Sequence, residues 1–354
     1  MRRVIAALVM LALIAAVPAD RRFAPVRPGV VLSFPRDHGA HPAYRSEWWY
    51  LTGWLDEPGG RHRGFQITFF RSATGLSAHS RSAFAPRQIL LAHAALSDPA
   101  LGHLLHGERI AREGLGLARA SRSDADVVLD DWHLRRLPDG RFVAHVAGQG
   151  FALDLAFSPG QPILLQGDHG FSRKGPEASS ASHYYSMPHL AVSGTVTEQG
   201  QVRKASGEAW LDREWSSSYL PEGAVGWDWT GLNFADGGAL MAFRIRRKDG
   251  SALWAGGTYR APQGGVVVLR PQDIAFTVRR RWRSVRTGGL YPVDPVLRVS
   301  LPGGVREWPM VPLFDDQELD GRPAGSPVYW EGAVTVPGGR GYLELTGYAG
   351  DLHL

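Results

Sequence analysis

The chain has 354 residues, of which 44% are hydrophobic and 21% are charged, and its formal net charge is +5. This composition is typical of a soluble globular protein and excludes a disordered chain or one with many membrane spans. The charge is too small, and lysine too rare, to indicate nucleic-acid binding. The length favours two domains. The chain has 12 Trp but no Cys, so the fold must be stabilised by its core rather than by disulfides.

Residues 1–19 have the pattern of a secretory signal peptide. Arg2 and Arg3 precede an apolar run at 4–17, which is too short to span a bilayer comfortably. Small residues before Asp20 predict cleavage there and export to the periplasm or the exterior. Cleavage removes two arginines and no acid, so the mature net charge is 37 − 34 = +3. A retained membrane anchor is the alternative, and the choice between the Sec and twin-arginine routes is open.

The mature chain opens with a hairpin pattern. Aromatic and β-branched residues fill 47–55 and 64–71, and a Pro/Gly turn separates the two runs. Most positions on both arms are apolar, which predicts burial on both faces or a filled barrel interior. We expect Glu47, beside two tryptophans, to anchor an arginine such as Arg71 or Arg244 inside a barrel.

Short strands follow at a spacing of about ten residues. They are expected at 91–97, 126–135, 141–147 and 150–157, each bounded by Gly, Pro or Asp. A brief helix is expected at 83–91. The pattern predicts an all-β sandwich or barrel with little helix.

A polar stretch at 158–188 lies between two strand-rich halves and is either a linker or a functional loop over a site. Its aromatic C-terminal end indicates that it is packed. The hairpin pattern then recurs at 227–232 and 239–247, which indicates a duplicated β unit. We therefore expect an N-terminal β domain at 30–200 and a C-terminal β domain at 201–354.

The segment 207–215 is the most unusual in the chain. As an extended strand it places three carboxylates and an indole on one face: Glu208, Trp210, Asp212 and Glu214. Carboxylates side by side repel one another and are costly to bury, so their presence among aromatic residues indicates a functional site. The alternative is a solvated sheet face on which Arg213 pairs with a neighbour.

Six strings of the chain share their order with those of one family. They are SEWWYLTG at 46–53, AHAALSD at 92–98, GDHGFSRKG at 167–175, SHYYS at 182–186, WLDREWS at 210–216 and GWDW at 226–229. With these strings the chain resembles the lipocalin-like hydroxyneurosporene synthase family, the AttH domain family of secreted proteins. The resemblance runs from about residue 30 to the C-terminus. It implies two lipocalin-like β-barrel domains packed together.

The resemblance also implies a reaction. Relatives in that family are carotenoid 1,2-hydratases, which add water across a terminal isoprenoid double bond without a cofactor. Their key residues fall in a His-x-Trp string and a later Tyr-x-Asp string. The matching positions here are His183 with Tyr185 and Trp210 with Asp212. The resemblance therefore implies catalytic roles for Asp212 and His183, while an exported location leaves a carotenoid substrate open.

Hydration of an unactivated alkene needs an acid that protonates carbon, a pocket that tolerates a carbocation, and a placed water. Asp212 serves as the acid only if burial or the nearby Glu208 and Glu214 raise its pKa. His183 would orient the acid or hold the water, and aromatic faces would stabilise the cation. The candidate ligand-binding residues are Tyr185, Trp210, Trp215, Trp227, Trp229, Glu208 and Glu214. The alternatives are a hydrogen-bonded loop histidine and tryptophans that belong to the core.

No cofactor is expected, and no spacing of His, Asp or Glu matches a metal-site signature. The first hypothesis is an exported hydro-lyase or isomerase acting on an isoprenoid-like or other lipophilic alkene. The competing hypotheses are a non-catalytic carrier of lipids in the cell envelope and an interaction module of an export or transport complex. The expected partner is a lipophilic small molecule. Peripheral membrane contact and the oligomeric state are left open.

Overall fold

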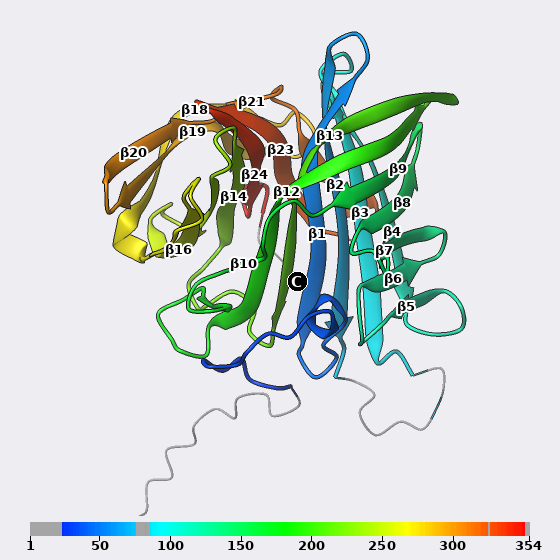
Figure 1. The fold of residues 1–354 in the computed structure, drawn as a ribbon, viewed down its shortest axis with the longest axis horizontal. Helices are drawn as coiled ribbons and strands as arrows, with labels where there is room; N and C mark the ends of the chain where they lie inside the picture. Colours follow the sequence, from blue (N-terminus) through cyan, green and yellow to red (C-terminus); the bar gives the residue numbers. More distant parts are fainter. Residues whose placement is uncertain (1–22, 76–81, 83–84, 325, 351–354) are drawn as a thin grey trace, which may run out of the picture.

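The computed structural model describes residues 23–75, 82, 85–324 and 326–350 (Figure 1). The expected signal peptide, residues 1–19, lies outside these residues. Over the described ranges the chain forms 24 β-strands and three one-turn 3-10 helices, η1 (Arg36–His38), η2 (Pro271–Asp273) and η3 (Arg322–Ala324). None of the helices in this part of the chain has the length and apolar character needed to cross a membrane.

The first sheet is antiparallel and has the strand order β4-β3-β2-β1-β13-β12-β9-β8-β7-β6-β5, with β10 and β11 also paired to β12. Its strands are β1 (Ser46–Glu57), β2 (Arg61–Ala73), β3 (Gln88–Asp98), β4 (His103–Arg112), β5 (Ala118–Ala120), β6 (Asp126–Leu129), β7 (Trp132–Arg136), β8 (Phe142–Gly148), β9 (Phe151–Ser158), β10 (Leu164–Leu165), β11 (Phe171–Arg173), β12 (Ala181–Glu198) and β13 (Gln201–Ser216). A Cβ added to Gly107 of β4 would lie 2.9 Å from the Cα of Gly148, the last residue of β8. The sheet therefore curls into a nearly closed barrel.

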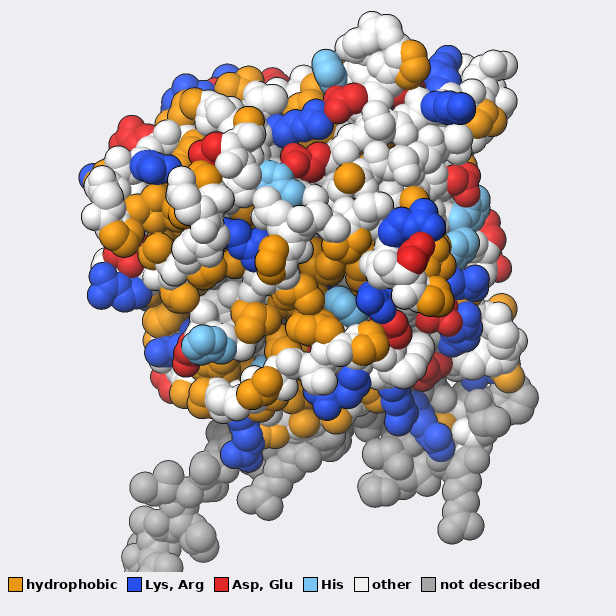
Figure 2. Space-filling view, viewed as in Figure 1, with side chains coloured by type: hydrophobic (Ala, Val, Ile, Leu, Met, Phe, Trp, Pro, Cys, Tyr) orange, Lys and Arg blue, Asp and Glu red, His pale blue; other side chains and the backbone are white. Residues whose placement is uncertain are grey.

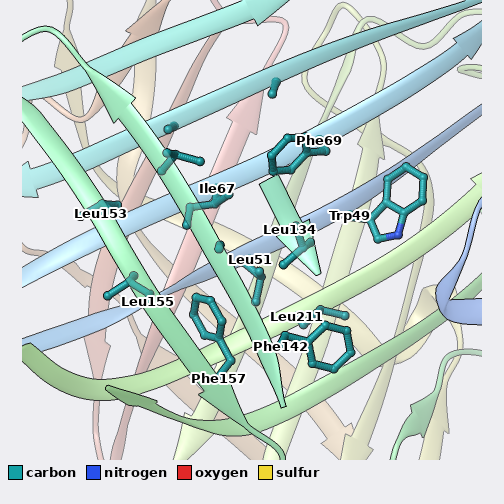
Figure 3. Packing of buried hydrophobic residues seen from close by; sticks show 14 of the residues in the cluster. Trp49, Leu51, Ile67, Phe69, Leu134, Phe142, Leu153, Leu155, Phe157 and Leu211 are labelled. Carbon is teal, nitrogen blue, oxygen red and sulfur yellow. The ribbon is translucent and has the colours of Figure 1, made fainter. Parts of the chain in front are cut away.

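The interior of this barrel is filled by side chains. Trp49 and Leu51 from β1, Phe69 from β2 and Phe142 from β8 are at most 1% exposed and point toward one another (Figure 3). Alternation along each strand sends these residues inward and their neighbours outward. The barrel is thus a packed core.

The second sheet has the order β17-β16-β15-β14-β24-β23-β21, with β22 paired to β23, and β18-β19-β20 form a third sheet. These strands are β14 (Gly226–Phe234), β15 (Ala239–Arg246), β16 (Ala252–Arg260), β17 (Val266–Leu269), β18 (Ile274–Arg283), β19 (Leu290–Leu301), β20 (Gly304–Pro309), β21 (Val311–Pro312), β22 (Glu318–Asp320), β23 (Val328–Val336) and β24 (Gly339–Thr346). Residues of the second and third sheets share a core that includes Leu232, Leu297 and Trp330.

The outer face of the first sheet packs against the second sheet, so β13, β1 and β2 lie beside β14, β24 and β23 (Figure 1). Several hydrogen bonds cross the boundary. Trp54 Nε1 donates to the carbonyl of Gly341 at 3.1 Å, and Gln66 Nε2 donates to the hydroxyl of Tyr329 at 2.8 Å. The space between the sheets is therefore lined by side chains from both halves of the chain.

Strand β12 changes phase along its length. Its register with β13 shifts between Met187 and Leu190, so two residues of β12 stand opposite one of β13. Tyr185 and Met187 before this bulge and Leu190 after it all point into the first barrel. Tyr184 and Ser186 are consequently left on the outer face.

The expected all-β class with little helix is confirmed. Glu47 accepts hydrogen bonds from Arg71 and Arg213 inside the first barrel, as expected for one of the two proposed arginines. Arg244 instead pairs with Asp228 of the second sheet at 2.6 Å. Each of these carboxylates neutralises buried guanidinium groups at the start of a hairpin.

The brief helix expected at 83–91 is wrong for residues 85–91, because 85–87 form no helix and 88–91 begin β3, which pairs with β2 and β4. Residues 83 and 84 lie outside the described part of the chain. The division into domains at 30–200 and 201–354 stays a prediction. In the pairing of the strands, β13 belongs to the first sheet, so the chain changes sheet between Ser216 and Gly226.

Candidate functional site between the two sheets

Strand β13 places the acidic face expected from its sequence between the two sheets. Trp210 belongs to the cluster shared by both sheets, whereas Leu211 belongs to the core of the first barrel. Asp212 lies on the same face as Trp210 and is 3% exposed. We call Trp210, Asp212, Glu214, Trp229 and Glu344 the inter-sheet site.

Three donors hold the carboxylate of Asp212. Ser186 and Trp210 donate to Oδ1, the latter from Nε1 at 2.6 Å, and the hydroxyl of Tyr184 donates to Oδ2. Trp229 Nε1 in turn donates to Tyr184 at 3.0 Å. Asp212 is therefore fixed from β12, from its own strand and, through Tyr184, from β14.

The segment at 158–188 supports this arrangement. Gln166 Nε2 donates to the hydroxyl of Ser186 at 2.7 Å, and the backbone N–H of Gln166 donates to the carbonyl of Tyr184. The prediction that the end of this segment is packed is confirmed, because Tyr184 is 4% exposed.

Burial raises the pKa of Asp212 to about 7, against its three hydrogen bonds, and the charge of Glu214 adds to the rise. Asp212 can therefore carry a proton near neutral pH. This is the protonation state that a general acid needs.

Glu214 and Lys174 form the next layer. Their Oε1 and Nζ atoms lie 3.9 Å apart, and each side chain keeps 13–14% of its surface exposed. Burial raises the pKa of Glu214 and lowers that of Lys174, while each charge favours the other. On the same face of β13, Glu214 is therefore more exposed to solvent than Asp212.

Aromatic rings surround these carboxyls. Trp229 is 7% exposed and packs edge-on against Tyr50 with ring centroids 5.2 Å apart. The centroids of Trp210 and Trp229 are 6.5 Å apart. Trp48 and Trp227 are only partly buried beside this cluster. Hydrophobic side chains gather near the middle of the face that shows β1, β10 and β12 (Figures 1 and 2).

A small pocket of about 10 Å³, which is room for about one water molecule, lies beside Trp210. It is lined by residues of β1, β13, β14 and β24, among them Trp54, Gly231 and Tyr342. Trp210 therefore belongs both to the inter-sheet site and to the lining of this small pocket.

The second sheet contributes carboxyls of its own. Burial raises the pKa of Glu344 to about 7 against a hydrogen bond from Trp227, and the charges of Asp212 and Glu214 raise it further. Glu331 stands directly opposite Glu344 across β23 and β24 and is 2% exposed. Burial, followed by the charge of Glu344, raises the pKa of Glu331 well above its ordinary value.

His183 and Tyr185 do not face Asp212, so the expectation that they do is wrong. The register pairs Ser186 with Asp212 and His183 with Trp215, which puts His183 on the barrel side of the sheet. The rings of His183 and Trp215 lie 5.5 Å apart, and burial lowers the pKa of His183 to about 4.

Tyr185 and Trp215 likewise belong to the core of the first barrel. Tyr185 shares a hydrogen bond of 2.6 Å with His38 Nδ1, and Trp215 stacks on His41 with centroids 3.8 Å apart. Their contacts are those of core residues. A ligand between the sheets would meet Tyr184 and Ser186 instead.

Glu208 does not act on Asp212. It bonds His189 Nδ1 at 2.6 Å, and against the effect of burial this bond raises the pKa of His189. Of the residues expected at the site, the structure brings together Trp210, Asp212, Glu214, Trp227 and Trp229. Their roles in binding or catalysis stay predictions.

Sequence reasoning missed the two hydroxyls that hold Asp212 and the two acids of the second sheet. Tyr184 and Ser186 were adjacent to the expected residues, and strict alternation from Asp212 would have found them once the register was known. Glu331 and Glu344 carry a weaker signal, since each is a single acid within an apolar strand. Within the described residues no group of three or more His, Asp or Glu is arranged to hold a metal ion.

The fold and the site define an all-β protein with two packed, lipocalin-like sheets and carboxyl groups between them. The chain belongs to the AttH-like family, which it matches over residues 25–348. Among curated proteins, none is significantly similar to it.

Three solved structures are similar to the chain. An AttH-type protein from Nitrosomonas europaea is 50% identical, with a TM-score of 0.85 over 92% of this chain and 100% of that one. Kievitone hydratase from Nectria haematococca is 14% identical, with a TM-score of 0.66 over 92% and 95%. CghA bound to Sch210972 is 13% identical, with a TM-score of 0.56 over 94% and 98%. The last two likenesses concern the fold alone.

Proposed function

We propose that the protein is a cofactor-independent hydratase or isomerase that acts on an alkene of a lipophilic, isoprenoid-like molecule. The observation that carries the proposal is Asp212, a buried carboxyl among aromatic rings whose pKa is raised to about 7. Such a group can hold a proton at neutral pH and deliver it to carbon, which an ordinary Asp cannot do.

The neighbours of Asp212 suit this chemistry. Transfer of its proton to one alkene carbon leaves a carbocation on the adjacent carbon. The faces of Trp210, Trp227 and Trp229 would stabilise that cation by about 1–2 kcal/mol per ring when desolvated. Addition of water then gives a hydrated product, whereas loss of a different proton gives an isomer.

The substrate belongs between the sheets rather than inside the first barrel, because that barrel is filled by its own side chains. The fold shared with a protein named kievitone hydratase agrees with the proposal, although the chemistry rests on Asp212. The apolar run at 4–17 supports an exported, periplasmic or secreted location, where the protein would meet lipophiles of the envelope and contact the membrane peripherally.

The test begins with native mass spectrometry of protein purified from its own cell envelope, to identify a co-purified lipophile. That lipophile and related alkenes are then incubated with the protein in H2¹⁸O. Wild-type protein should yield product carrying one added ¹⁸O or an isomer, and Asp212→Asn should bind the alkene but yield neither.

The matched control is Asp131→Asn, because Asp131 lies in the turn between β6 and β7 of the first barrel and its side chain is 53% exposed to solvent. It should behave as wild type. Equal binding by wild type and Asp212→Asn, with no turnover by either, would refute the enzyme hypothesis and support the non-catalytic lipid carrier. Absence of any bound lipophile would leave only the hypothesis of an interaction module in an export or transport complex.

A further inference from the structure

Glu331 and Glu344 form a second carboxyl pair across the boundary from Asp212. They are direct partners on adjacent antiparallel strands, and side chains at such positions have Cβ atoms about 4.5–5.5 Å apart. Like charges in that arrangement repel, so two ionised carboxylates there are unfavourable. The pair is therefore expected to hold a proton.

Glu331 is 2% exposed, and against the effect of burial the hydroxyl of Tyr50 beside its carboxyl lowers its pKa. Within the described residues, neither oxygen of Glu331 makes a hydrogen bond of good geometry. A buried carboxyl whose oxygens are not fully hydrogen-bonded is costly, and water or a ligand group is the usual partner of such an atom. The neighbourhood of Glu331 is therefore a place for a water or for a polar group of a ligand.

Glu344 joins this place to the inter-sheet site. It stands opposite Glu331 on one side and opposite Trp229 on the other, through the pairing of β24 with β23 and with β14. It is partly exposed, whereas Glu331 is buried. Trp229, the partner of Glu344 on β14, donates through Nε1 to Tyr184, and Tyr184 donates to Asp212. Asp212 and Glu344 thus lie on opposite sheets with Trp229 and Tyr184 connecting them.

We propose that Glu344 is the base that removes a proton from the attacking water, while Asp212 protonates the alkene carbon from the facing sheet. Glu331, as a neutral acid beside Glu344, positions that water. This inference rests on the proposed function and divides it into an acid on the first sheet and a base on the second.

The step balances without a further reactant. The Asp212 proton forms a C–H bond as the π bond breaks, and the water oxygen bonds to the adjacent carbon. Glu344 takes one proton of that water, so the net change is addition of H2O. The proton on Glu344 then returns to Asp212 by exchange with solvent at Glu214, which is 13% exposed.

The charges of the two groups suit these roles. Their pKa values are both raised to about 7, so near neutrality the two carboxyls share protons rather than both being ionised. The state with Asp212 protonated and Glu344 ionised is therefore accessible at the pH at which both are needed.

The two roles are separated by two isotopes. Reversible protonation of carbon by Asp212 incorporates deuterium from D2O into the alkene, and hydration incorporates ¹⁸O from H2¹⁸O. Glu344→Gln should lower ¹⁸O incorporation at least about 100-fold, within the usual range for loss of a general base, and retain deuterium exchange. Asp212→Asn should lose both. Glu307→Gln, an exposed change on β20, should lose neither.

Loss of both isotopes to the same extent in Glu344→Gln, or retention of both, would overturn the assignment. Circular dichroism and thermal unfolding establish that each variant is folded. If Glu344→Gln does not fold, Glu344→Ala with added formate replaces it. Formate should restore ¹⁸O incorporation, and failure to do so in the folded variant would count against the base. If wild-type protein incorporates neither isotope into any alkene, the proposed function itself fails.

Discussion

Replacement of Asp212 by Asn is expected to change how the stability of the protein depends on pH. The pKa of Asp212 is about 7 in the folded chain against an ordinary value of 3.8, a difference of about 3 units. At about 1.36 kcal/mol per unit this amounts to about 4 kcal/mol. The folded state holds the proton of Asp212 more tightly than the unfolded state does. The resulting contribution to the free energy of unfolding is fully present below the ordinary pKa and declines as the pH rises toward 7.

Asn cannot titrate, so the variant should become more stable relative to wild type by up to about 4 kcal/mol between about pH 4 and pH 8. Urea unfolding of both proteins at a series of pH values measures the difference, and Asp131→Asn should show no such trend. A difference that is constant over this range would refute the reasoning. It would mean that the three hydrogen bonds outweigh burial and that Asp212 stays ionised, which removes the acid.

Three further substitutions test neighbouring parts of the argument. Tyr184→Phe removes a donor that lowers the pKa of Asp212, so the loss of hydration with rising pH should move to higher pH, as pH–rate profiles would reveal. Glu47→Gln leaves the buried guanidinium groups of Arg71 and Arg213 without a countercharge, so it should lower the free energy of unfolding in urea by about 3–5 kcal/mol. A decrease below about 1 kcal/mol would show that solvent or another acid compensates. His183→Gln should lower the unfolding temperature but leave hydration within a few-fold of wild type, since the side chain lies in the barrel; a loss as large as that of Asp212→Asn would return His183 to the site.

The fold class was accessible from the sequence because its signal is local. Runs of β-branched and aromatic residues bounded by turns mark strands without any knowledge of their partners. The limit between residues 30–200 and 201–354 stays a prediction. In the structure, Gln199 and Gly200 have positive φ and form the two-residue turn of the hairpin that joins β12 to β13.

The site was only half accessible, because a site depends on register. Alternation within β13 placed Trp210 and Asp212 on one face correctly. The residues that meet Asp212 from β12 could not be read in the same way, since pairing with a second strand fixes them. A match of short strings suggested His183 and Tyr185, each one position away from the side chains that face outward. Glu344 depends on the contact of two sheets, which no local pattern encodes.

The bulge in β12 makes the site sensitive to chain length as well as to side-chain identity. The alternation of side chains along β12 reverses at the bulge. Before it Tyr184 and Ser186 point outward, and after it apolar residues such as Leu190 point inward. Deletion of one residue at 188–189 would bring the two stretches into a single phase. The part of β12 whose pairing with the adjacent strands is retained would keep its alternation. In the other part, every side chain would move to the opposite face of the sheet. Such a deletion would therefore exchange Tyr184 and Ser186 for core residues, or bury polar groups in the barrel, without substituting a single residue of the site.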